Sequence, residues 1–137
     1  MIVVDSSAVI AMMLEEPSAP VVAGRLAADT ERFMSVASYL EAGTVLAGRR
    51  RRDRLKAIDE LDAFLSETGI DLVPVDVTQG RLALRARITH GRGMGLGGTL
   101  NFGDAFSYAL AKSRDAPLLF VGNDFAATDI KPALALQ

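Results

Sequence analysis

The chemistry open to this chain rests mainly on its carboxylates. The 137 residues include no cysteine and one histidine, against 17 Asp and Glu and 15 Lys and Arg. These counts exclude disulfides, Cys/His zinc sites, iron–sulfur clusters and a thiol nucleophile. Any acid–base or metal chemistry is therefore expected to use Asp and Glu side chains.

Four of the acids fall where an α/β fold would collect them. Asp5 directly follows the first expected strand, and Asp124 follows the clearest later strand. Glu41 and Asp104 lie near the starts of two expected helices. The carboxyl ends of parallel strands and the helix starts that follow them meet at one edge of a sheet. Carboxylates gathered there repel one another, and a hard divalent cation such as Mg²⁺ or Mn²⁺ relieves the repulsion. Such a site activates water and stabilises charge on a phosphodiester.

Each acid taken alone also has a purely structural interpretation. Asp5 and Asp104 are plausible helix N-caps. Ser38 and Glu41 have the spacing of a capping box, in which the glutamate returns to a backbone amide. Asp124 suits a turn. The metal-site hypothesis therefore depends on the four positions together.

The hydrophobic pattern predicts the elements that must position these acids. Strands are expected at 2–4, 32–35, 71–75 and 118–121, with a last short strand at 129–131, and Pro74 favours a sheet edge or strand end for the third. Helices are expected at 8–15, 21–29, 37–50, 54–68, 78–89 and 102–114. This alternation predicts a three-layer α/β/α sandwich around a mostly parallel sheet. The length and the absence of a linker indicate one domain over residues 1–137.

Charge and hydropathy limit the partners. A net charge of −2 argues against a protein that coats nucleic acid through bulk basicity. Four consecutive arginines at 49–52 fit either a solvated helix end or an RNA phosphate contact, and Arg81, Arg85 and Arg87 form a second basic candidate. No apolar run is long enough to predict a membrane helix. The lack of cysteine fits a reducing cytoplasm.

A glycine-rich segment at 91–98 contains the pattern G-x-G-x-x-G. A dinucleotide fingerprint should follow a strand and open a helix, whereas a helix is expected before this segment. We favour a mobile loop that borders the groove expected at the acidic edge of the sheet.

The sequence resembles PIN-domain ribonucleases, and specifically the VapC toxins of bacterial type II toxin–antitoxin pairs. The resemblance covers nearly the whole chain and rests on the segments VVDSSAVIAMML, ASYLEAGTVL, LNFGDAFSYALAKSRDAPLLFVGNDF and TDI. It implies a PIN-like α/β/α fold and a cytoplasmic, Mg²⁺- or Mn²⁺-dependent endoribonuclease. It also implies an RNA substrate, inhibition by a cognate antitoxin, and a homodimer.

Matched to the family's acidic residues, the catalytic and metal-binding positions are Asp5, Glu41, Asp104 and Asp124. The first is followed by small hydroxyl residues, as in the family. Many relatives carry another acid two residues before the fourth position, where this chain has Gly122. Whether Asp124 or Asp129 completes the acidic site therefore stays open at this point.

Two functions from different classes remain. One is a metal-dependent endoribonuclease toxin, and the other is a degenerate PIN-like binding module that has kept the acids as caps. A response-regulator receiver shares the parallel α/β architecture but needs an acidic pair at the first strand. Here Asp5 is followed by Ser6 and Ser7, which argues against a receiver.

Overall fold

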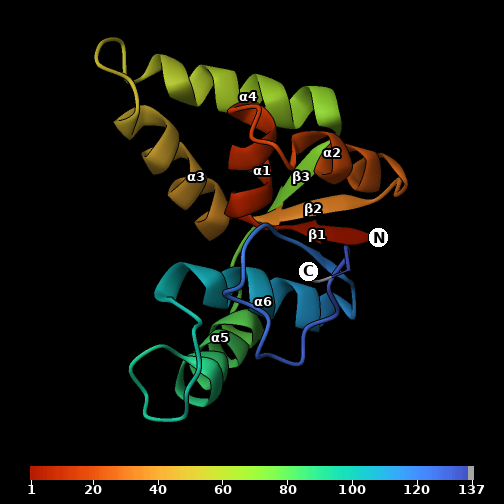
Figure 1. The fold of residues 1–137 in the computed structure, drawn as a ribbon, viewed down its shortest axis with the longest axis vertical. Coiled ribbons are helices and arrows are strands. Elements are labelled where there is room, and N and C mark those ends of the chain that lie inside the picture. Colours follow the sequence, from red (N-terminus) through yellow and green to blue (C-terminus); the bar gives the residue numbers. More distant parts are fainter. Residues whose placement is uncertain (136–137) are drawn as a thin grey trace.

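A four-stranded parallel sheet forms the centre of the computed structural model, which describes residues 1–135 (Figure 1). Its strands are β1 (Ile2–Val4), β2 (Arg32–Ser35), β3 (Ile70–Val73) and β4 (Leu118–Leu119). The strand order is β3-β2-β1-β4, and each neighbouring pair runs parallel. The interior position of β1 places its carboxyl end near the middle of one sheet edge.

Helices cover both faces of the sheet. They are α1 (Ser6–Met13), α2 (Ala19–Ala27), α3 (Val36–Gly48), α4 (Lys56–Thr68), α5 (Val77–His90) and α6 (Phe102–Arg114). The first four lie on one side of the sheet, and α5 and α6 lie on the other (Figure 1). This arrangement confirms the predicted α/β/α sandwich.

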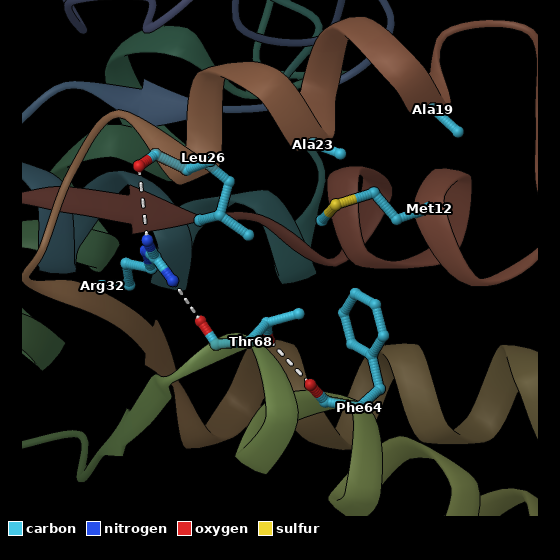
Figure 2. A pocket seen from close by; sticks show the side chains of 8 residues that line it. Met12, Ala19, Ala23, Leu26, Arg32, Phe64 and Thr68 are labelled. Carbon is cyan, nitrogen blue, oxygen red and sulfur yellow. Dashed lines mark hydrogen bonds between the residues drawn. The ribbon is translucent and has the colours of Figure 1, made fainter.

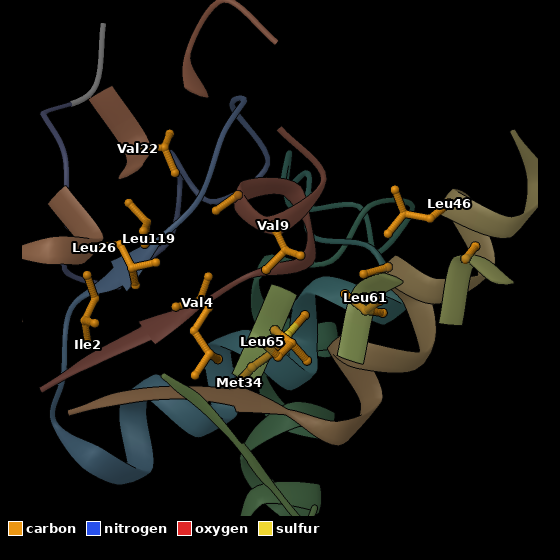
Figure 3. Close-up of a cluster of buried hydrophobic side chains, with 14 residues drawn as sticks. Ile2, Val4, Val9, Val22, Leu26, Met34, Leu46, Leu61, Leu65 and Leu119 are labelled. Atoms are coloured by element: carbon orange, nitrogen blue, oxygen red, sulfur yellow. The ribbon is translucent and has the colours of Figure 1, made fainter. Parts of the chain in front are cut away.

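The short strand β1 is anchored by burial on both faces. Ile2 and Val4 pack into the cluster formed with α1, α2, α3 and α4, shown in Figure 3. Val3 points the other way, into the cluster formed with α5 and α6. All three side chains are fully buried, as expected for a strand with an apolar layer on each side. This packing holds the residue that follows the strand, Asp5, in a defined place.

The structure changes several predicted boundaries. The third strand ends at Val73, directly before Pro74, and lies at the sheet edge as predicted. The fourth strand is only two residues long. The last strand predicted at 129–131 is wrong: these residues form no strand, and the isolated parallel bridge to Leu118 is made by the next residue, Pro132. The first two helices each begin and end two residues earlier than predicted.

The predicted helix caps are also revised. Asp5 caps α1, as its structural interpretation proposed. The N-cap of α3 is Ser35, so the predicted capping box starting at Ser38 is wrong. The N-cap of α6 is Asn101, and Asp104 is its capping-box partner and not the cap itself. Among residues 1–135, no helix is long and apolar enough to cross a membrane.

Candidate active site

Four carboxylates from four separate segments line one pocket of about 230 Å³. Asp5 follows β1, and Glu41 lies in the second turn of α3. Asp104 lies in the first turn of α6, and Asp124 follows β4. We call this pocket the acid pocket. It lies at the carboxyl edge of the sheet, where parallel α/β folds bind ligands.

Asp5 is held by hydroxyl groups on both of its oxygens. The Ser7 hydroxyl and backbone N–H donate to Oδ2 over 2.6 and 3.0 Å. The Ser107 hydroxyl of α6 donates to Oδ1 over 2.5 Å. The carboxylate is only 2% exposed. Hydrogen bonds to a buried carboxylate replace its lost water and fix its orientation.

A hydrogen bond between two serine hydroxyls connects α3 to this network. The Ser38 and Ser107 hydroxyls lie 2.8 Å apart, and both residues are buried. The Ser7 hydroxyl also accepts from the Val121 backbone N–H over 3.0 Å, which ties the segment after β4 to Asp5. The sequence pattern pointed to no role for Ser107, and for Ser38 it pointed only to the capping box that the structure does not show. The i, i+3 spacing from Asp104 to Ser107 was the available signal, because it places both on one helix face.

Glu41 reaches the pocket because a glycine faces it. Its carboxylate accepts a hydrogen bond from the Ser6 hydroxyl. On its other side, a Cβ atom at Gly103 would overlap with the carboxylate. The glycine before Asp104 therefore leaves room for the Glu41 carboxylate beside the first turn of α6, which an alanine would fill.

Asp104 is buried and electrostatically strained. Its Oδ2 accepts from the Asn101 backbone N–H over 3.0 Å, and the Asn101 side chain accepts from the Asp104 N–H over 2.8 Å. Burial raises the pKa of Asp104 to about 7, and the charges of Asp5, Asp124 and Glu41 add to this rise against the opposing hydrogen bond. Ionisation of all four carboxylates at once is therefore unfavourable in the acid pocket.

The structure separates the two candidates for the fourth acid. Asp124 lines the acid pocket, and its Oδ1 lies 3.8 Å from the Arg92 guanidinium. Asp129 does not line the pocket, and it accepts from the Tyr108 hydroxyl over 2.5 Å and from Lys112 over 3.1 Å. The Tyr108 hydrogen bond is the main reason why the pKa of Asp129 is lowered. Position therefore favours Asp124.

The donor chemistry of the acid pocket fits a hard divalent cation. Among the described residues its lining includes four carboxylates, an asparagine and two serines, and no Lys or Arg. Oxygen donors of this kind suit Mg²⁺ and Mn²⁺. Within residues 1–135, however, no three His, Cys, Asp or Glu side chains are grouped closely enough to hold an ion as they stand. A bound cation would have to draw the carboxylates closer together.

A different pocket, of about 290 Å³, lies between α2 and α4 (Figure 2). Its lining is largely apolar, with Met12, Leu26 and Phe64 around it. Arg32 at its end donates to the carbonyls of Asp29 and Thr68 over 2.7 and 2.6 Å. These contacts hold the C-terminal ends of α2 and α4 together, and a cation is favourable there because the helix dipole is negative at its C-terminus. We therefore assign Arg32 a structural role.

Comparison with known proteins assigns this fold to a class. The PIN domain family model matches residues 2–131, and the chain belongs to the PIN-domain family. Among curated proteins it is similar to Ribonuclease VapC28 of Mycobacterium tuberculosis, with 45% identity over 132 residues that cover 96% of this chain and 97% of VapC28. Ribonuclease VapC30 of the same species is 44% identical over 128 residues, covering 93% and 95% of the two chains.

A solved structure supports the same fold. The crystal structure of M. tuberculosis VapC20, described as a Sarcin-Ricin loop cleaving toxin, matches with a TM-score of 0.72. The match covers 95% of this chain and 96% of VapC20, at 19% identity. At this identity the likeness demonstrates the shared architecture.

Proposed function

We propose that this protein is a VapC-type toxin that cleaves RNA internally by hydrolysing phosphodiester bonds. In this proposal Asp5, Glu41, Asp104 and Asp124 hold Mg²⁺, or Mn²⁺ in its place. The observation that carries the proposal is the meeting of these four acids, from four distant segments, in one pocket. The similarity to VapC ribonucleases over nearly the full length supports RNA as the substrate.

The chain's own residues prepare the pocket in three ways. When bound, Mg²⁺ or Mn²⁺ would supply an activated water and charge stabilisation at the scissile phosphate. The serine hydroxyls orient Asp5 before any ligand arrives. Ser6 orients Glu41. Burial keeps a proton on Asp104 for part of the time near neutral pH in the metal-free protein, which lowers the repulsion among the four acids.

The test is RNA cleavage by the purified protein in Mg²⁺, in Mn²⁺ and in EDTA. Asp5→Asn and Asp104→Asn are expected to reduce cleavage at least about 100-fold, the usual scale for losing one preorganised group at a reacting phosphate or carbonyl. Asp115→Asn is the matched control, because Asp115 is an exposed acid whose partner Lys131 bonds to the amino end of β4. Equal activity in all four proteins, or full activity in EDTA, would contradict the proposal.

A metal titration separates this proposal from a non-catalytic binding module. A cation that binds only the native state raises stability. We expect Mg²⁺ to raise the melting temperature of the wild type and to have little effect on Asp5→Asn. The absence of a shift at millimolar Mg²⁺ or Mn²⁺ would favour the binding module, whose acids act only as caps.

We also propose a cognate antitoxin as the physiological inhibitor, acting on this protein in the cytoplasm. An apolar groove of about 450 Å³ between α3 and α4 supports it, because Leu40 and Leu55 at the groove are 69% and 78% exposed. An amphipathic helix suits such a groove. Co-purification with the product of an adjacent small reading frame, lost in Leu55→Asp, would support this partner, and co-purification unaffected by the substitution would exclude this groove.

A homodimer is proposed on a separate apolar face. Leu84 and Ile88 of α5 and Phe102 of α6 are 65%, 55% and 72% exposed around a common pocket. Exposed apolar patches of this kind mark interaction sites. Light scattering with size exclusion should give twice the chain mass of 14.6 kDa for the wild type, and the mass of a monomer for Leu84→Glu. A monomeric wild type would contradict the dimer.

A further inference from the structure

The acid pocket has one basic neighbour in the described part of the chain. The Arg92 guanidinium lies 3.8 Å from Asp124 Oδ1, and no other Lys, Arg or His in residues 1–135 pairs with a carboxylate of the pocket. The Arg92 side chain is 67% exposed, and Asp124 is 45% exposed. The pair therefore lies at the rim, between the acids and solvent.

The backbone of Arg92 is fixed even though its side chain is exposed. Its N–H donates to the Leu100 carbonyl over 2.9 Å, and the Leu100 N–H donates to the His90 carbonyl over 3.0 Å. These bonds close the neck of the glycine-rich loop. A Cβ at Gly98 would overlap with the His90 carbonyl, so a glycine is needed for the neck to close. The backbone of Arg92 therefore lies in the hydrogen-bonded neck of the loop and not at its tip.

The neck is joined to two of the pocket acids. Leu100 directly precedes Asn101, whose side chain and backbone form the capping box with Asp104. On the other side, the Thr99 hydroxyl donates to the Asp124 carbonyl over 2.9 Å. The position of Arg92 relative to the pocket is therefore set by the same contacts that position Asp104 and Asp124.

Arg92 can leave Asp124 and bind another negatively charged group. A pair at 3.8 Å between two exposed groups is weak and screened by salt. Within residues 1–135 the Arg92 guanidinium makes no hydrogen bond, so its five N–H donors remain for a ligand. A guanidinium matches a phosphate with two parallel hydrogen bonds. A cation at the rim would reduce the repulsion between an incoming RNA phosphate and the acids of the pocket.

We propose that Arg92 binds a backbone phosphate of the RNA substrate next to the scissile bond, exchanging its contact with Asp124 for one with the phosphate. This inference rests on the proposed ribonuclease function and names a substrate-binding residue for it. The exchange would also release Asp124 toward the other three acids. Arg92 accordingly serves substrate binding and not the retention of the metal.

The experiment compares Arg92→Gln and Arg92→Lys with Lys131→Gln. Lys131 is a matched control, since it is also 67% exposed and paired with an aspartate, and its backbone bonds to the amino end of β4. Cleavage kinetics are measured with total bacterial RNA at several salt concentrations. Binding of a fluorescein-labelled single-stranded RNA of mixed sequence is measured by anisotropy in Mg²⁺, with each variant placed on the Asp5→Asn background so that the RNA stays intact.

We expect Arg92→Gln to raise KM and the RNA Kd about tenfold, the scale of one charge-assisted hydrogen bond. Arg92→Lys should lie between it and wild type, because lysine keeps the charge and loses the paired geometry. The slope of log affinity against log salt should fall by about 0.7, the value for one phosphate contact on a single strand. Lys131→Gln should leave all of these quantities unchanged.

Two results would overturn the inference. One is an unchanged RNA Kd and salt slope in Arg92→Gln. The other is a fall in kcat with unchanged KM, fully restored by lysine, which would make Arg92 a positioning residue for Asp124.

A Mn²⁺ titration followed by melting temperature provides a third readout, and Arg92→Gln should bind Mn²⁺ at least as tightly as the wild type. If the wild type cleaves no RNA, the proposed function fails, while the binding measurements still test Arg92.

Discussion

Replacing Asp104 by asparagine is expected to stabilise the metal-free protein at alkaline pH, although the same change should abolish catalysis. Burial and the three neighbouring carboxylates raise the pKa of Asp104 from 3.8 to about 7 in the folded chain. Between these two values the folded protein binds a proton that the unfolded chain has lost. Stability therefore falls as the pH rises through this range, and the loss is complete above the folded pKa.

The size of the effect follows from the two pKa values. A difference of about three pH units, at roughly 1.4 kcal/mol for each, costs about 4 kcal/mol once Asp104 is ionised in the fold. About 3 kcal/mol of this is lost between pH 5 and pH 8. For a domain of this size that loss corresponds to a decrease of about 10 °C in melting temperature. The lowered pKa values of Asp29 and Asp129 act below pH 4, outside this window.

The assay is urea unfolding in EDTA at pH 5, 6, 7 and 8 for wild type and Asp104→Asn. The asparagine oxygen can still accept from the Asn101 N–H, so the capping box is kept and the charge alone is removed. We expect the wild type to lose stability toward pH 8 and the variant to stay nearly constant. Parallel curves for the two proteins would refute the electrostatic account of the acid pocket.

Three further predictions concern residues around the pocket. Gly103→Ala should weaken the metal-induced stabilisation and RNA cleavage while circular dichroism stays native, because the new Cβ would displace the Glu41 carboxylate from its present position; metal binding and cleavage at the wild-type level would contradict this packing argument. Ser107→Ala leaves a buried oxygen of Asp5 without its donor, and urea unfolding should show a loss of about 1–3 kcal/mol; an unchanged midpoint would speak against the hydroxyl network. Asp129→Asn should cost about 1 kcal/mol, reduced by its exposure, and leave RNA cleavage at the wild-type rate; a large loss of cleavage would return Asp129 to the site.

Local features of the sequence were enough to predict the layers and the edge at which the acids gather. Apolar runs and helical periodicity carry this information because each depends on neighbours within a few residues. Pro74 identified an edge strand for the same reason, since a residue without an N–H cannot serve a central strand. Asp5 was placed correctly because it directly follows a buried strand. The exact caps of α3 and α6 were missed because several nearby polar residues could each have filled the position.

Tertiary packing decided the rest of the site. The Glu41 carboxylate lies against Gly103 of α6, and Ser107 reaches Asp5 from 102 positions away along the chain. Asp124 enters the pocket while Asp129, five residues later, turns to α6. The spacing of residues along the chain does not give the distance in space between elements that come into contact only when helices pack on both faces of the sheet. The types of the candidate catalytic side chains were thus readable from the sequence, whereas their burial, their mutual repulsion and the position of Arg92 at their rim depend on how the helices pack.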